Sequence, residues 1–350
     1  MPHRRRVGGG VFLCLRARPR LRNRCTLRPI EGGNRTTPTL FSSRFRPVPT
    51  APVLTLTGPT AVGKTELSLA TAEALDAEIV SVDSRQVYEE LTIGTAKPAP
   101  EAQARVPHHL IGERTLHEPL SAGAYADVAN DRIAEIRERG KRALVVGGAT
   151  LYLHALQYGL ADIPDVDDAV RERLQARLET EGKQALYDEL TEVDPTQAAE
   201  MDPTKTQRVL RALEVYHGTG RPLSHYYEQQ PEPPFDYVTV VLNRDRQRLY
   251  DRINRRVDQM LESGLLDEVR AVMDMDGVQL DKPPLSTIGY REPIQHLRGE
   301  IDYDEMVRLV KRNTRRYAKR QLTWFRRYDE YQWREAPQTT AADLVEELRY

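Results

Sequence analysis

Residues 58–65 read Gly-Pro-Thr-Ala-Val-Gly-Lys-Thr and fit the phosphate-binding pattern G-x-x-x-x-G-K-[ST]. The glycines let backbone amides turn toward phosphate oxygens, Lys64 adds a positive charge, and Thr65 can place its hydroxyl on Mg²⁺. A short apolar run precedes the loop, and the run after it reads as a helix whose positive N-terminus would face the anion. The predicted phosphate site consists of Gly58, Pro59, Thr60, Ala61, Val62, Gly63, Lys64 and Thr65.

Asp83 ends a second short predicted strand, residues 78–83. A carboxylate at a strand end beside a phosphate loop suits a general base or a metal ligand. The alternative is a structural cap at a strand-to-helix turn. The position favours a functional role.

Two basic clusters stand out. Arg248, Arg252, Arg255 and Arg256 share one face of a predicted helix at residues 246–261, where they could close over a pyrophosphate or simply pair with nearby aspartates. Near the C-terminus, pairs of Lys and Arg alternate with aromatic residues, which suits nucleic-acid binding; the alternative is an amphipathic surface helix. The sequence does not decide the first case and favours nucleic acid in the second.

His108 and His109 are adjacent in a predicted third strand. Neighbouring residues of a strand point to opposite faces, so these two side chains cannot easily share one metal ion. We expect a structural role for both.

The chain has 350 residues, and its charge is unevenly distributed. Residues 1–50 hold 12 Arg, one acid and both cysteines, which predicts a disordered basic extension or an organellar transit peptide. The remaining 300 residues hold 39 Lys and Arg against 51 Asp and Glu. A polyanion would therefore have to bind through a local basic patch. No apolar run approaches the roughly 20 residues that span a membrane.

Strands alternating with helices predict an α/β fold with a parallel sheet, whose site lies at the carboxyl ends of the strands. From about residue 165 to 234 the strand pattern is lost and helical spacing takes over. We therefore predict a P-loop core with an inserted helical domain and a helical C-terminal region. The predicted boundaries are 1–50 for the extension, 51–164 and 235–335 for the core, 165–234 for the insertion and 336–350 for a tail.

With these motifs in order, the chain resembles the tRNA dimethylallyltransferase (isopentenyl-tRNA transferase) family over nearly all of residues 52–333. The resemblance rests on eight segments: GPTAVGKT at 58–65, VDSRQVY at 82–88, IGTAKP at 93–98, PHHLI at 107–111, VGGATLY at 146–152, QRVLRALEVY at 207–216, IGYRE at 288–292 and TRRYAKRQLTWFR at 314–326.

The resemblance implies transfer of a dimethylallyl group from its diphosphate to the exocyclic amine of the adenosine just 3′ of the tRNA anticodon. It implies that the loop holds pyrophosphate, that Asp83 is the base, and that four segments and two single positions contact tRNA. Those positions are Asp83, Ser84, Arg85, Gln86, Ala149, Arg171, Gln207, Arg208, Val209, Leu210, Arg211, Ser286, Thr287, Ile288, Gly289, Tyr290, Arg291, Lys319, Arg320, Gln321, Leu322, Thr323, Trp324, Phe325 and Arg326.

The chain departs from the family pattern at one place. The family usually has V-G-G-T, whereas this chain has Ala149 followed by Thr150. A hydroxyl that would touch tRNA is therefore missing or displaced by one residue.

A diphosphate leaving group needs positive charge, for which Lys64, the loop amides, Mg²⁺ held by Thr65 and an arginine such as Arg246 or Arg256 are the candidates. The isoprenoid tail needs an apolar pocket, expected from small or apolar neighbours at the strand ends: Ala61, Val62, Ala149 and Leu151.

Two rival hypotheses remain: an ATP-using nucleotide or small-molecule kinase, and a non-catalytic RNA-binding module. We expect Mg²⁺ as cofactor, the tRNA anticodon stem-loop and dimethylallyl diphosphate as partners, a monomer, and a cytoplasmic location unless residues 1–50 direct the chain to an organelle.

Overall fold

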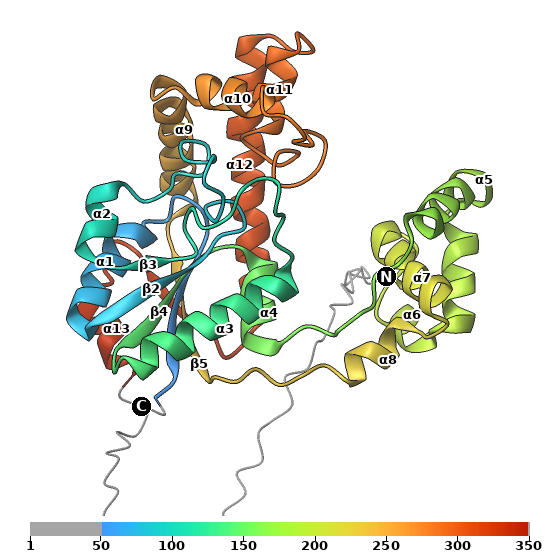
Figure 1. The fold of residues 1–350 in the computed structure, drawn as a ribbon, viewed down its shortest axis with the longest axis horizontal. Coiled ribbons are helices and arrows are strands. Elements are labelled where there is room, and N and C mark those ends of the chain that lie inside the picture. Colours follow the sequence, from blue (N-terminus) through green and yellow to red (C-terminus); the bar gives the residue numbers. More distant parts are fainter. Residues whose placement is uncertain (1–50, 349–350) are drawn as a thin grey trace, which may run out of the picture. The chain divides into compact units, whose positions relative to one another are not determined.

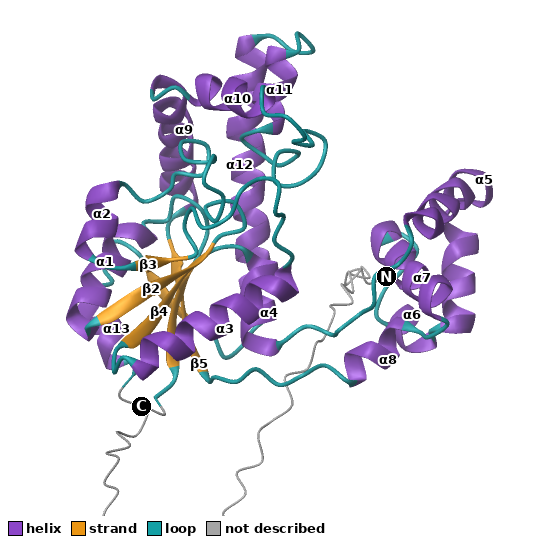
Figure 2. Ribbon diagram, in the orientation of Figure 1, coloured by secondary structure: helices purple, strands orange, loops and turns teal. Residues whose placement is uncertain are grey.

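The computed structural model describes residues 51–348, so the predicted N-terminal extension lies outside the described residues. A six-stranded sheet forms the centre of the core, and every pairing in it is parallel. Its spatial order is β3-β2-β4-β1-β5-β6 (Figures 1 and 2). The strands are β1 (Val53–Thr57), β2 (Ala77–Val82), β3 (His108–His109), β4 (Arg142–Gly147), β5 (Tyr237–Asn243) and β6 (Gln332–Glu335).

The apolar runs seen in the sequence form the middle of this sheet. All residues of β1 and β2 are buried, as expected for strands covered on both faces. In the register, Thr57 at the end of β1 lies beside Gly147 at the end of β4, and Val82 at the end of β2 lies on the other side of Gly147. The phosphate loop, the Asp83 turn and the glycine turn therefore begin at the same edge of the sheet.

Helices cover both faces of the sheet. Ile133 and Ile136 of one helix pack with Leu156 of another on one face, while Leu69 and Leu344 belong to the apolar cluster of the opposite face. The face helices are α3 (Ala122–Glu138) and α4 (Thr150–Tyr158) on one side, with α1 (Lys64–Leu75) and α13 (Ala341–Glu346) on the other (Figure 1).

A helical region stands beyond the carboxyl ends of the strands (Figure 1). Its core includes Val269, Tyr290 and Ile294, all buried. Buried Met306 and Val310 contribute to a smaller cluster. The helices here are α9 (Arg246–Glu262), α10 (Leu265–Met273), α11 (Arg291–Leu297) and α12 (Tyr303–Phe325). The short helix α2 (Pro100–Arg105) lies beside α1, where Arg105 pairs with Glu73 (Figure 1).

Residues Ile163–Gln229 form a separate helical unit with a hydrophobic core of its own. The sequence predicted a helical insertion at 165–234, and this unit contains helices only. Gly182 has a left-handed φ of 82° that kinks the longest of them. The helices are α5 (Asp168–Val193), α6 (Pro195–Ala199), α7 (Thr206–Thr219) and α8 (Leu223–Glu228).

The C-terminal region is helical over Tyr303–Phe325, as its sequence pattern predicts, but a strand and a helix that were not predicted follow. Strand β6 adds to the sheet beside β5, with Val241 opposite Trp333. Helix α13 lies within the segment predicted as a tail, and its Leu344 is fully buried among residues of the core.

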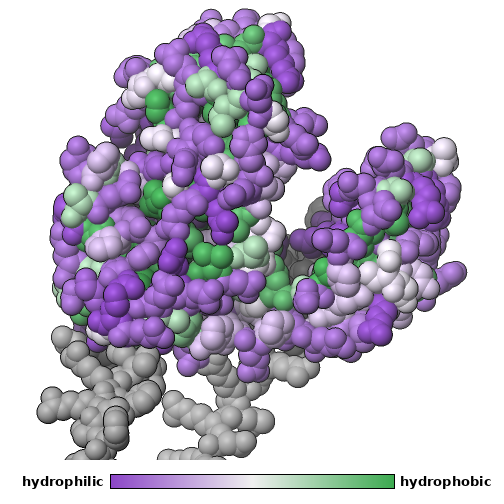
Figure 3. Space-filling model, in the orientation of Figure 1, coloured by the Kyte–Doolittle hydropathy of each residue, from purple (hydrophilic) through white to green (hydrophobic). Residues whose placement is uncertain are grey.

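The surface is mostly hydrophilic on the face drawn in Figure 3, with hydrophobic residues in small patches. Leu151, Tyr227 and Tyr303 are the large hydrophobic residues that are exposed among residues 51–348. In the same range, none of the helices combines the length and apolar character needed to cross a bilayer.

Candidate active site

A cavity of about 650 Å³ lies at the carboxyl ends of β1, β2 and β4. It is lined by Thr60 to Thr65 of the phosphate loop, by Asp83, and by the glycine turn Gly147-Gly148. Helices α9 and α12 contribute Arg252, Arg255, Arg256, Tyr317 and Gln321. Residues that are far apart in the sequence therefore surround one space, at the position expected for a site in a parallel sheet.

The phosphate loop has the strained backbone that such loops need. Ala61 and Gly63 have left-handed φ angles of 63° and 119°. The Lys64 Nζ donates hydrogen bonds to the carbonyl oxygens of Gly58, at 2.9 Å, and Pro59, at 3.1 Å. These bonds place the ammonium group across the inside of the loop.

Lys64 is held beside another cation. Burial and repulsion from Arg256 lower the pKa of Lys64 to about 8, although the charge of Asp83 acts in the opposite direction. Burial also lowers the pKa of Arg256. Two desolvated cations next to one carboxylate leave an excess of positive charge, and an anion with several oxygens would relieve it.

Three side chains hold the phosphate loop in place through its backbone. Arg244 donates to the Val62 carbonyl from Nε, at 3.1 Å, and Nη2, at 3.0 Å. Arg252 Nε donates to the Ala61 carbonyl at 2.8 Å. The amide of Gln321, which is only 2 % exposed, accepts from the Thr60 N–H at 3.0 Å and donates to the Gly148 carbonyl at 2.7 Å.

The arginines of α9 that were candidates for binding diphosphate differ in whether they reach the cavity. Arg252, Arg255 and Arg256 line the cavity, whereas Arg246 and Arg248 do not. Arg246 is exposed, with its guanidinium 5.3 Å from the ring centroid of Tyr250. The structure therefore favours Arg256 over Arg246 as a ligand for diphosphate.

Sequence reasoning missed Arg244, which follows β5 directly. Its place at the carboxyl end of a parallel strand was a usable signal, because Asp83 was selected on the same ground.

Asp83 lies at the end of β2 and serves as a turn cap. Its Oδ1 accepts from the Arg85 N–H at 2.9 Å and from the Gln86 N–H at 3.2 Å. The structural alternative from the sequence is thus observed. Capping does not exclude a role for Asp83 as general base. Both cap bonds use Oδ1, and Asp83 lines the cavity together with Lys64 and Arg256.

The turn after Asp83 connects two further loops. Gln86 Nε2 donates to the carbonyls of Thr95, at 3.1 Å, and Ala96, at 3.2 Å. Arg85 Nη1 donates to the Ile288 carbonyl at 2.8 Å. The segments 83–86 and 286–291, both predicted from the family resemblance, therefore meet at the cavity. The loop at 93–98 is bonded to the first of these segments through Gln86.

Several side chains within the segments predicted to contact tRNA are buried inside their own unit. Each is at most 5 % exposed, and all but Gln321, which lines the cavity, pack in a hydrophobic core and present no side chain at the surface. These residues are Val209, Leu210, Tyr290, Gln321 and Phe325.

Ala149 is also buried, at the start of α4, and Leu151 is exposed. Neither lines the cavity, so both are removed from the predicted tail pocket. Ala61 and Val62 do line it. The additional apolar lining, which sequence reasoning missed, comes from the helices beyond the strands: Ile253, Val257, Met260, Leu265 and Val310.

Helix α12 presents a basic surface. Lys319, Arg320 and Arg326 are exposed, and Arg320 lies 5.8 Å from the ring centroid of Tyr317. Trp324 is half-buried, with the Arg327 guanidinium 4.7 Å from its ring centroid. This pattern of exposed cations with aromatic rings is the one expected for a nucleic-acid surface.

Within the separate helical unit, Gln207 and Arg208 are exposed on α7. Arg171 pairs with Asp168 and with the buried Glu214, and Arg211 pairs with the same glutamate. Glu214 therefore fixes the two arginines side by side on this unit.

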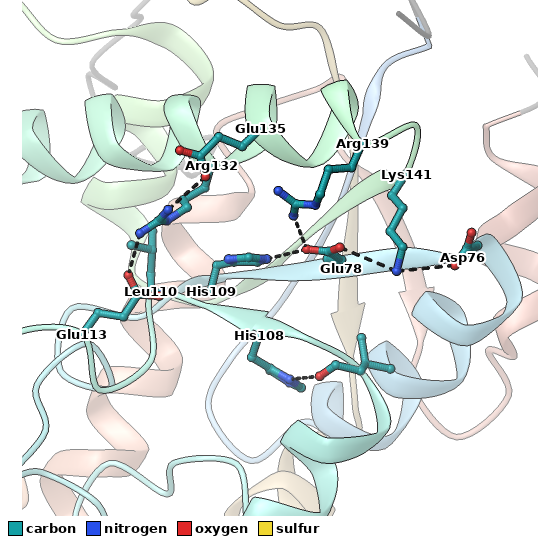
Figure 4. Close-up of polar contacts among 11 residues, drawn as sticks. Asp76, Glu78, His108, His109, Leu110, Glu113, Arg132, Glu135, Arg139 and Lys141 are labelled. Atoms are coloured by element: carbon teal, nitrogen blue, oxygen red, sulfur yellow. Dashed lines mark hydrogen bonds and ion pairs between the residues drawn. The ribbon is translucent and has the colours of Figure 1, made fainter.

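The two adjacent histidines point away from each other (Figure 4). Nδ1 of His108 lies 2.7 Å from the Val106 carbonyl, and Nε2 of His109 lies 2.7 Å from the Glu78 carboxylate. Arg139 and Lys141 also pair with Glu78. The contacts of His109 agree with the expected structural role, whereas His108 also lines the cavity. Residues 51–348 contain no group of three His, Cys, Asp or Glu that could hold a metal.

Comparison with known proteins gives one family. Residues 86–328 match the family described as IPP transferase. A tRNA dimethylallyltransferase of Salinibacter ruber is 80% identical over 298 residues, which cover 85% of this chain and 92% of that protein.

Two solved structures agree with this match. The full-length tRNA isopentenylpyrophosphate transferase of Bacillus halodurans is 40% identical, with a TM-score of 0.62, over 85% of this chain and 95% of that one. A eukaryotic dimethylallyltransferase, described as acting on tRNA, is 29% identical, with a TM-score of 0.64, over 78% of this chain and 69% of that one.

Proposed function

We propose that this chain, which belongs to the IPP transferase family of tRNA dimethylallyltransferases, transfers a dimethylallyl group from dimethylallyl diphosphate to N6 of the adenosine 3′-adjacent to the tRNA anticodon. The observation that carries the proposal is the cavity that Lys64, Arg256 and Asp83 share. It brings cations for a leaving group and a carboxylate for a proton into one space.

The leaving group is held by the phosphate loop. As the bond between C1 and the diphosphate oxygen breaks, negative charge grows on that oxygen. The phosphate loop, the Lys64 ammonium and the Arg256 guanidinium would stabilise this charge, because these residues line the cavity before the reaction. Diphosphate leaves with its electron pair.

The acceptor loses its proton to Asp83. The exocyclic amine of adenine is a poor nucleophile, so removal of its proton while N6 bonds to C1 lowers the barrier. The backbone amides of Arg85 and Gln86 fix the carboxylate through Oδ1 and orient it for this transfer. The adenosine must leave its stack to reach the carboxylate, as is general for enzymes that modify bases.

The cavity also suits the donor's tail. Ile253, Val257 and Met260 line it from α9, and Leu265 and Val310 add apolar surface from α10 and α12. A five-carbon isoprenoid gains free energy by leaving water for such a lining. A ribose or an adenine ring gains less there. This supports an isoprenoid diphosphate over ATP, and the comparisons give no support to a kinase.

The residues present fit the expected Mg²⁺. A magnesium ion prefers oxygen ligands and commonly binds through one or two protein oxygens together with substrate phosphates. Thr65 lines the cavity at the start of α1 and would supply its hydroxyl. When bound with the diphosphate, the ion would neutralise part of its charge.

For the tRNA, Lys319, Arg320 and Arg326 of α12 supply the exposed cations that would contact phosphates. The monomeric state and the cytoplasmic location stay predictions.

A thermal-shift titration tests the donor assignment. Dimethylallyl diphosphate with Mg²⁺ should raise the melting temperature by mass action. At a ligand concentration 100 times Kd, the free energy of unfolding should increase by about 2.7 kcal/mol. ATP at equal concentration should protect less, through its phosphates only. Lys64→Ala should remove the protection, whereas Lys183→Ala, which changes an exposed lysine of the helical unit, should not. Stronger protection by ATP would support the kinase instead.

A further inference from the structure

Glu268 lies in the first turn of α10 and accepts four hydrogen bonds, three of them from a loop more than 170 residues earlier in the chain. Its Oε2 accepts from the N–H groups of Thr92, at 2.9 Å, and Ile93, at 2.6 Å. Its Oε1 accepts from the Gly94 N–H at 3.0 Å and from the Tyr290 hydroxyl at 2.7 Å. Three consecutive amides bonded to one carboxylate fix the path of the loop.

The loop that Glu268 holds forms part of the cavity wall. Gly94, Thr95 and Ala96 line the cavity, whereas Glu268 does not. Ala96 has a left-handed φ of 49°, a conformation that a non-glycine residue adopts only when its surroundings impose it. A Cβ at Gly94 would lie 2.6 Å from the Tyr290 ring, so the loop and the ring are in close contact.

From this loop the connection reaches Asp83 in two steps. The carbonyls of Thr95 and Ala96 accept from Gln86 Nε2, and the Gln86 N–H donates to Asp83 Oδ1. A loop that moved would therefore release the side chain of Gln86, whose backbone orients the carboxylate.

Tyr290 provides a second connection. Its hydroxyl is bonded to Glu268, and the preceding Ile288 accepts from Arg85. Burial and the charge of Glu268 raise the pKa of Tyr290, which keeps its hydroxyl protonated as a donor. One carboxylate thus joins the loops on both sides of the Asp83 turn.

We propose that Glu268 is a positioning residue, which holds the loop at 92–96 and the segment at 287–290 so that the Asp83 carboxylate is set for proton removal. The proposal rests on the proposed function of Asp83. Glu268 itself touches no substrate. We expect its effect on the turnover step, because Glu268 bonds neither to the phosphate loop nor to the exposed cations of α12.

The kinetic test compares three variants. Glu268→Gln keeps the size of the side chain but replaces one carboxylate oxygen by an NH₂ group, which cannot accept. In place of Oε2 this group would face two N–H donors, and in place of Oε1 it would face one N–H and the tyrosine hydroxyl. We expect kcat to fall at least tenfold, with KM for tRNA and for dimethylallyl diphosphate within threefold of wild type. Glu268→Asp should recover part of kcat, because the acceptor atoms remain. Asp267→Asn, an exposed neighbour that pairs with Arg270, is the matched control and should behave like wild type.

Hydrogen exchange gives a readout that does not depend on activity. In Glu268→Gln, amides in the peptides covering 83–97 should exchange at least tenfold faster, and those of β1 should be unchanged. Wild-type exchange in 83–97, or a loss seen only as higher KM with normal kcat, would overturn the proposal. If the wild-type enzyme transferred no dimethylallyl group, the proposed function would fail, but faster exchange in 83–97 would still establish that Glu268 holds the Asp83 turn.

Discussion

Replacing Gln321 by Met tests how the phosphate loop is held in place. The change keeps the length of the side chain but removes both groups of the amide. The Thr60 N–H then loses its acceptor and the Gly148 carbonyl loses its donor. At about 0.5–1.5 kcal/mol for each buried hydrogen bond, the folded state should lose about 1–3 kcal/mol.

In a unit of this size, each kcal/mol corresponds to a shift of about 2–4 °C in melting temperature. A loss near the middle of that range, about 2 kcal/mol, predicts a fall of roughly 4–8 °C. Thermal unfolding followed by circular dichroism measures it. Thr323→Met, at an exposed position of the same helix, is the control and should shift the melting temperature little.

The same variant should also bind diphosphate more weakly, because the Thr60 amide is part of the loop that surrounds the anion. Protection by inorganic diphosphate in the thermal-shift assay should therefore shrink. If the melting temperature and the protection both stay at wild-type values while KM for tRNA rises, Gln321 contacts tRNA, as the family resemblance implied, and our account of the loop is incorrect.

Three further outcomes follow from the site and the sheet. Asp83→Ala should lower kcat by orders of magnitude with a much smaller effect on tRNA affinity, because a base acts in the transition state; turnover within a few-fold of wild type would contradict the assignment. Replacing Lys319, Arg320 and Arg326 together by Ala should weaken tRNA binding and reduce the slope of log K against log salt by about 2–3, with KM for the donor unchanged; an unaltered slope would refute the basic surface. Burial alone would raise the pKa of Glu78, but hydrogen bonds and charge from His109 and Arg139 lower it below its ordinary value of 4.5. The Glu78 carboxylate therefore stabilises the folded state above pH 4.5, and this stabilisation is lost as pH falls through the lower pKa of the folded state. Glu78→Gln should be less stable than wild type by about 1–3 kcal/mol at pH 7 and approach wild type in acid. An equal difference in the free energy of unfolding at pH 7 and pH 3, measured in urea, would argue against this role.

The sequence predicted the parts of the fold that depend on local pattern. The buried runs of β1 and β4 and the glycines beside them were readable because strands of a parallel sheet are apolar throughout and its site lies at their ends. Strand β6 was missed because Gln332–Glu335 is mostly polar and joins the sheet only through backbone pairing with β5.

The supports of the site were missed for a related reason. Arg244 and Glu268 act on backbone groups of loops that lie 182 and about 175 residues away, and side chain type does not encode such a partner. The burial of residues within the segments predicted to contact tRNA was more predictable. On α12, Ala318, Gln321 and Phe325 follow helical spacing along the buried face, which separates them from the exposed cations between them.

The central claim is the transfer of a dimethylallyl group to tRNA, and incubation with radiolabelled dimethylallyl diphosphate, Mg²⁺ and unmodified tRNA tests it most directly. We predict that the label enters tRNA with release of diphosphate, and that nuclease digestion recovers it on N6 of the adenosine 3′-adjacent to the anticodon. Asp83→Ala should abolish incorporation. Unlabelled tRNA in the wild-type reaction, together with phosphate transfer from γ-labelled ATP to a small molecule or nucleotide, would contradict the account and identify a kinase.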